Sequence, residues 1–160
     1  QTGFGLAVLY NRSLYLARDA GVFSMMHVPK NLFMMLLNGP RAVGGDSSPV
    51  LAFHWFEPSP WGMGLFFTSP GLVYAFRAGI RKRLAQASWM AIAVILVPVL
   101  SYYGIGFVQF GFRYALDFMP FLGLLVALGL PRPLTSRSMA LISASVLVNV
   151  WGAIFLAIWI

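Results

Sequence analysis

The alternation of long apolar runs with short charged linkers predicts a bundle of membrane helices. Residues 84–112 carry no charge, and neither do the stretches 58–76 and 139–160. A helix needs about 20 mainly apolar residues to cross the hydrocarbon core of a bilayer. We therefore expect an all-α integral membrane fold with a transmembrane bundle over 58–160, made of four spans near 58–76, 87–107, 114–130 and 139–160.

Two features inside these runs predict close packing between helices. Pro70, in the phrase Thr68-Ser-Pro-Gly71, lacks a backbone N–H and interrupts the first span, a defect that neighbouring membrane helices can satisfy. In the last span Ser145, Asn149 and Gly152 fall on one helix face. Small and polar residues at this spacing are typical of helix–helix contacts with an interhelical hydrogen bond.

The N-terminal third is not a membrane span. Residues 1–10 are apolar but too short to cross, so we expect them to end a membrane helix whose beginning is missing, which makes the chain a fragment of a longer protein. Residues 11–57 are predicted to form an extracytoplasmic loop. Within it, Pro29 and the pair Gly39-Pro40 bracket a short apolar helix near 29–38, which we expect to lie in the membrane interface or under a lid.

Composition and charge agree with a membrane protein and exclude other classes. The chain is 59% hydrophobic and only 9% charged, whereas soluble domains carry roughly 25% charged residues. The net charge of +7 does not indicate nucleic-acid binding, because the basic residues form no single face and many of them lie in two linkers between apolar runs. Placing the linkers 77–83 and 131–137 in the cytoplasm satisfies the positive-inside rule and puts residues 11–57 and the 108–113 loop outside.

Few residues have the chemistry of a catalytic or metal site. The chain has no cysteine, which excludes disulfides, thiolate metal sites and cysteine nucleophiles. His54 and Glu57 have a spacing that offers two metal ligands, but a site needs three or four. We therefore predict no metal site and no cofactor in this chain.

Arg113 and Asp117 are the main candidate site residues. Their i, i+4 spacing places them on one helix face, where they can pair. One interpretation is structural: Asp117 favours the positive end of a helix dipole, and Arg113 extends to the headgroups. The other is functional: the guanidinium of Arg113 binds the phosphate of a lipid-linked substrate at the outer leaflet.

Several phrases along the chain form a recognisable pattern. They are Tyr10-Asn11, Val28-Pro-Lys-Asn-Leu32 with Pro40, Pro58-Ser-Pro-Trp-Gly62, Thr68-Ser-Pro-Gly-Leu72, Gln109-Phe-Gly-Phe-Arg-Tyr114, Asp117-Phe-Met-Pro-Phe-Leu122 and Asn149-Val-Trp-Gly152. Together they resemble the C-terminal part of bacterial GT-C-type membrane glycosyltransferases, similar to the protein O-mannosyltransferases and lipid A aminoarabinose transferases of glycosyltransferase family 39.

The resemblance implies a function at the cell envelope. It implies a multi-pass protein of the bacterial inner membrane that transfers a sugar from a polyprenyl-phosphate donor on the outer face, in some members with a divalent metal. It places Arg113 near the donor phosphate. It supports a role for Asp117 less strongly, because many members of the family have an uncharged residue at that position. The family's catalytic acid lies in an early outer loop that this chain does not contain, so we assign no catalytic residue here. The alternatives are a fragment of a transporter or flippase, in which Arg113 and Asp117 gate a polar pathway, and a non-enzymatic assembly subunit.

Overall fold

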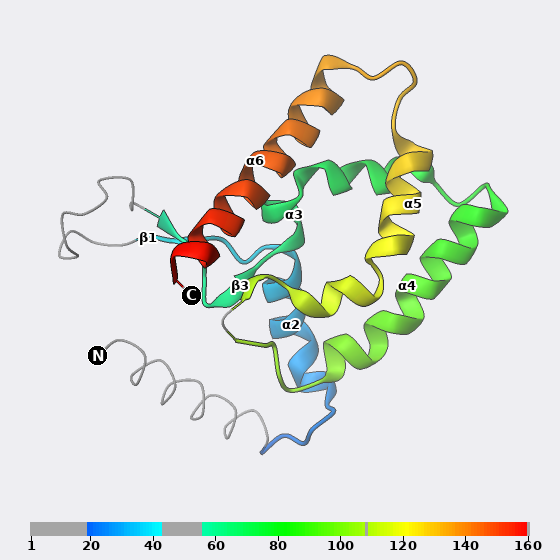
Figure 1. Ribbon diagram of the computed structural model, residues 1–160. Coiled ribbons are helices and arrows are strands. Elements are labelled where there is room, and N and C mark those ends of the chain that lie inside the picture. Colours follow the sequence, from blue (N-terminus) through cyan, green and yellow to red (C-terminus); the bar gives the residue numbers. More distant parts are fainter. Residues whose placement is uncertain (1–18, 43–55, 108, 160) are drawn as a thin grey trace.

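The fold is mostly helical, in a computed structural model that describes residues 19–42, 56–107 and 109–159 (Figure 1). Two pairs of very short strands accompany the helices: β1 with β2 antiparallel, and β3 with β4 parallel. The elements in chain order are η1 (Met25–His27), α2 (Val28–Leu36), β1 (Arg41–Ala42), β2 (Phe56–Glu57), β3 (Trp61–Met63), α3 (Leu65–Thr68), η2 (Pro70–Ala78), α4 (Arg83–Ser101), β4 (Gln109–Gly111), η3 (Arg113–Asp117), α5 (Met119–Gly129) and α6 (Ser136–Trp159).

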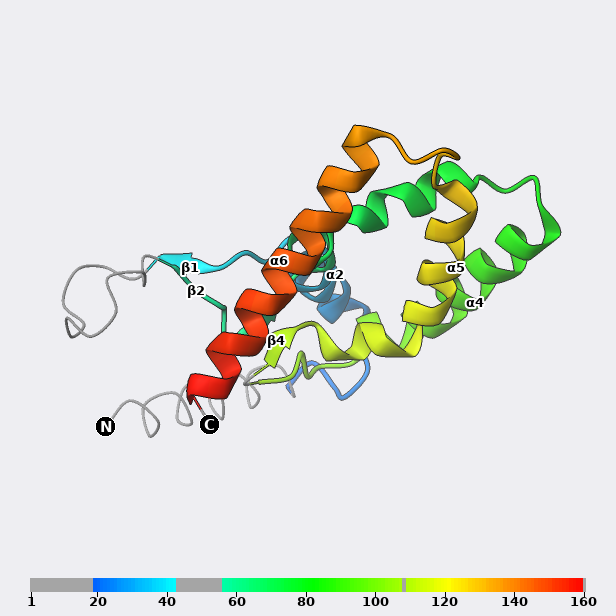
Figure 2. The ribbon, with the colours of Figure 1, turned by 45° about the horizontal axis from the view of Figure 1, so that its top comes forward.

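Two helices, α4 and α6, are long and apolar enough to cross a membrane. Their apolar windows have mean hydropathies of 1.9 and 2.0, and only 17% and 6% of these windows are buried within the chain. The core helix of a soluble protein would be mostly buried, so this exposure fits a lipid environment. Both views show α4 and α6 on opposite sides of the bundle (Figures 1 and 2), with α5 and η2 packed between them.

The two other predicted spans are not continuous helices. Segment 58–76 contains β3, the four-residue helix α3 and, after a break at Ser69, part of the 3-10 helix η2. Gly62, with a φ of 88°, and Pro70 explain why a single α-helix does not form there. Segment 114–130 begins in the 3-10 helix η3 and becomes α-helical only at Met119. The eleven residues of α5 rise about 16 Å, roughly half of the hydrocarbon thickness.

The backbone groups on either side of the break before Pro70 form hydrogen bonds with α6, in agreement with the polar face predicted for the last span. The backbone N–H of Gly71 donates to Ser145 Oγ at 3.1 Å, and Asn149 Nδ2 donates to the Thr68 carbonyl at 2.8 Å. One turn further along α6, Gly152 is buried against the ring of Phe110, which occupies the place a Cβ would need. The predicted interhelical hydrogen bonding of this face is therefore confirmed.

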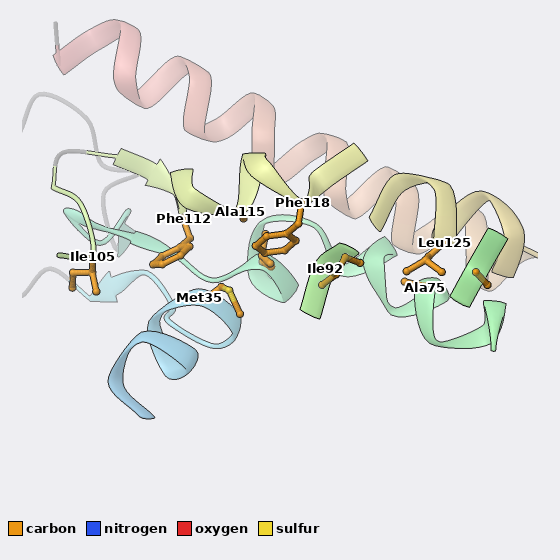
Figure 3. Close-up of a cluster of buried hydrophobic side chains, with 10 residues drawn as sticks. Met35, Ala75, Ile92, Ile105, Phe112, Ala115, Phe118 and Leu125 are labelled. Carbon is orange, nitrogen blue, oxygen red and sulfur yellow. The ribbon is translucent and has the colours of Figure 1, made fainter. Parts of the chain in front are cut away.

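A tight contact between α5 and η2 organises the opposite end of the bundle. A Cβ on Gly129, the last residue of α5, would overlap the Tyr74 carbonyl and lie 2.9 Å from the Ala78 nitrogen. The C-terminal ends of both elements therefore lie side by side, and the basic linkers leave from there in different directions, one to α4 and the other to α6 (Figure 1). Buried apolar side chains form a row from Ile105 to Leu125 that joins α2, α4, α5 and η2 (Figure 3).

A helix is present where the sequence predicts a short one, and it is anchored to α4. Asn31, on α2, is 1% exposed, and its Nδ2 donates to the carbonyls of Leu100 and Tyr102, at 2.8 and 2.6 Å. The helix α4 ends at Ser101, six residues before the predicted boundary at 107, because Tyr102 adopts an extended backbone conformation. The predicted membrane-helix end over 1–10, Asp46 and His54 lie outside the described residues.

Candidate functional site

Arg113 lines a hollow of about 300 Å³ where segments that are distant in the sequence meet. The hollow combines apolar walls with polar side chains. Its polar lining residues are Thr68, Ser69, Gln109, Arg113 and Asn149, and its apolar ones are Leu65, Phe110, Phe112, Ala115, Leu116 and Met119, with Gly111. Residues from three separate parts of the chain thus form one surface, which no single segment of the sequence reveals.

The strand pair β3–β4 fixes the backbone just before Arg113. Trp61 pairs with Gln109, and Met63 pairs with Gly111. The side chain of Gln109 strengthens this junction, because its Nε2 donates to the carbonyls of Trp61 and Ile105, each at 2.8 Å. Gly62 and Gly106 leave room for this amide: a Cβ on either would lie within 3.0 Å of it. A buried amide with two backbone partners restricts the strand that presents Arg113.

The guanidinium of Arg113 is free to bind an anion. It lies over the ring of Tyr114, 5.4 Å from the ring centroid, and the side chain is exposed. Within the described residues it makes no ion pair, and the ion pair present there joins Arg41 to Glu57 at 3.4 Å. A guanidinium presents a rigid fork of donors that matches the oxygens of a phosphate.

The predicted pairing of Arg113 with Asp117 was wrong. Residues 113–117 form the 3-10 helix η3, in which residues three apart are eclipsed. Residues four apart are then separated by about a third of a turn, so the two side chains do not share a face. Asp117 is exposed and does not line the hollow. Pro120, in the first turn of α5, marks where the α-helix starts.

A shallow apolar groove on α6 adjoins the polar part of the hollow. It is open along most of its surface and is lined by residues of α6 alone, Ser145, Val146, Asn149, Val150 and Ala153. Asn149 lines both the groove and the hollow. The sequence predicted only a packing role for Asn149, because it shares a helix face with Ser145. The structure shows that Asn149 also lies between a polar and an apolar surface, which its spacing in the sequence does not indicate.

The candidate metal ligands are not brought together in the described part of the chain. No group of three or more His, Asp or Glu side chains occurs there. His27 Nε2 lies 2.9 Å from the Gly21 carbonyl, and Glu57 pairs with Arg41. The remaining predicted candidate, His54, is outside the described residues.

The arrangement combines a free cation, hydrogen-bonding groups and an adjoining apolar groove, which suits an amphiphile with an anionic head. Ser69 contributes a hydroxyl to the hollow, whereas the Asn149 amide already donates to the Thr68 and Ser145 carbonyls. Comparison with protein-family models, with curated proteins and with solved structures finds no match to this chain.

Proposed function

We propose that this chain is part of a multi-pass glycosyltransferase of the bacterial inner membrane. In this proposal it transfers a sugar from a polyprenyl-phosphate donor at the outer face, and Arg113 binds the donor phosphate. The observation that carries the proposal is the hollow itself. It unites Thr68-Ser69, the stretch Gln109–Arg113 and Asn149, which belong to three of the phrases that resemble this enzyme family.

The amphiphilic character of the site supports a lipid-linked donor. The phosphate would lie at the guanidinium of Arg113, and the apolar chain beyond it would lie along the shallow groove on α6 next to Asn149. A phosphate ester without a lipid would leave this apolar groove unused. An apolar ligand without a charge would leave the guanidinium solvated only by water.

Charge supports the proposed orientation. The linkers after η2 and α5 lie at one end of the bundle and carry basic residues without acids. Arg113 precedes α5, whose other end meets those linkers. With these linkers in the cytoplasm, the hollow would face the outer half of the membrane. In this arrangement the chain would cross the membrane four times. The helices α4 and α6 would cross as continuous helices, and α3–η2 and η3–α5 would cross as broken helices whose free backbone groups form hydrogen bonds inside the bundle.

Arg113 would assist the reaction through its charge. When the bond between the sugar and the phosphate oxygen breaks, negative charge grows on the departing polyprenyl phosphate. A fixed guanidinium in a partly apolar site stabilises that charge more than water does. The acid–base chemistry on the acceptor needs a carboxylate from another part of the protein, as the resemblance implies.

Transfer assays on the full-length protein test this proposal. Membranes containing the wild type or Arg113→Gln are given radiolabelled polyprenyl-phosphate sugars, and product is measured. Losing one charge-stabilising donor should lower the rate about 100-fold or more, and Arg113→Lys should fall between the two. Arg41→Gln, an exposed arginine outside the hollow, serves as the matched control. Undiminished transfer by Arg113→Gln would overturn the proposal.

A further inference from the structure

We infer that the end of the bundle formed by the two basic linkers binds the headgroups of anionic phospholipids. This surface, called the basic end below, is independent of Arg113 and of the proposed transfer reaction. It consists of six exposed cationic side chains: Arg77, Arg81, Lys82, Arg83, Arg132 and Arg137. They come from two linkers about fifty residues apart in the sequence.

Packing places both linkers at the same end of the bundle. Gly129 allows the end of α5 to touch the backbone of η2 at Tyr74 and Ala78. The chain leaves both elements at this end, and the linkers then lead to the two long apolar helices, α4 at Arg83 and α6 at Ser136 (Figure 1). Basic linkers that precede helices suited to a bilayer are expected at the level of the headgroups.

The basic end has no carboxylate to neutralise it. The chain has four acidic residues, Asp19, Asp46, Glu57 and Asp117, and none lies in either linker. Among the described residues, none of the six cations forms an ion pair, and Arg77 lies over the ring of Tyr74 at 5.1 Å. Positive charge that no carboxylate compensates attracts anions to this end of the bundle.

Apolar residues among the cations identify the partner as a lipid surface. Ile80 is 69% exposed and Leu134 is 52% exposed, one in each linker, and Leu84 follows at 52%. In water these side chains would be exposed at a cost, whereas at a membrane surface they enter the acyl region beside the headgroups. A nucleic acid or an acidic protein would use the charges but not these side chains. Each basic residue near an anionic surface contributes about 1 kcal/mol.

Lipid binding to the purified full-length protein tests the inference. Delipidated protein in a neutral detergent is titrated with phosphatidylglycerol or phosphatidylcholine, and bound lipid is counted by native mass spectrometry. The double variant Arg81→Gln/Lys82→Gln is compared with Lys30→Gln/Arg41→Gln, which removes the same charge from exposed positions elsewhere. Circular dichroism checks that each variant keeps its helices.

The wild type should bind phosphatidylglycerol at least tenfold more tightly than phosphatidylcholine. Two charges at about 1 kcal/mol each predict a loss of roughly 30-fold in the Arg81/Lys82 variant, and 0.5 M salt should reduce the preference. The control variant should keep it. Equal affinity for both lipids, or equal loss in both variants, would overturn the inference, and so would a soluble acidic protein that binds in place of the lipid.

Discussion

Replacing Gly129 by alanine tests the contact that organises the basic end. The new methyl group would overlap the Tyr74 carbonyl and come within 2.9 Å of the Ala78 nitrogen. Both neighbours are backbone atoms, so no side chain can rotate away. Relief requires the end of α5 and η2 to move apart.

The same helix offers a matched control. Gly123 is an exposed glycine of α5, and a Cβ there would meet no atom within 4 Å. Gly123→Ala should therefore stabilise the protein by roughly 0.5–1 kcal/mol through helix propensity and reduced unfolded-state entropy. At Gly129 the same gain is outweighed by overpacking of about 1–3 kcal/mol, at the upper end because the backbone must shift. The two variants should then differ by roughly 2–3 kcal/mol.

Unfolding in mixed micelles measures this difference. Full-length wild type and both variants are titrated with sodium dodecyl sulfate, and helix content is followed by circular dichroism. A Gly129→Ala protein as stable as Gly123→Ala would show that α5 and η2 do not approach each other this closely. The placement of both basic linkers at one end would then lose its physical basis.

Three further stability predictions use the same assay. Ser145→Ala removes the acceptor of the Gly71 N–H, so it should lower the free energy of unfolding by about 0.6–1.7 kcal/mol. Ser143→Ala, at an exposed position of the same helix, should change it by less than about 0.5 kcal/mol, and equal losses in both variants would contradict the contact. Asn31→Leu leaves two backbone carbonyls at the end of α4 without their donor and should cost about 1–3 kcal/mol, so an unchanged transition would refute the anchoring of α2. Arg41→Gln breaks an exposed ion pair and should cost less than about 1 kcal/mol; a larger loss would mean that this pair is buried in the whole protein.

The two helices suited to crossing a membrane were predictable because their signal is local. The runs that became α4 and α6 are long, apolar and nearly free of helix breakers, and their own composition decides the outcome. Pro98 does not end α4, since a proline near the end of a membrane helix is tolerated. The break at Pro70 was also local, and so was the polar face of α6 that satisfies it.

The site was less predictable because its geometry depends on distant partners. Gln109 donates to the Trp61 carbonyl, 48 residues away, and nothing in its own neighbourhood in the sequence indicates that role. The pairing of Arg113 with Asp117 failed because an i, i+4 rule assumes an α-helix, whereas this segment is a 3-10 helix. Pro120 contained a signal for this, since proline favours the first turn of a new helix.

Equilibrium binding of a prenyl phosphate tests the central role of Arg113 most directly. The dissociation constants of a short-chain prenyl phosphate and of its parent alcohol are measured for full-length wild type and Arg113→Gln in the same detergent. A charged hydrogen bond contributes about 1.5–3 kcal/mol, so the wild type should prefer the phosphate by roughly 10- to 100-fold. Arg113→Gln should lose that preference while binding the alcohol unchanged. The same preference for the phosphate in the variant would contradict the account.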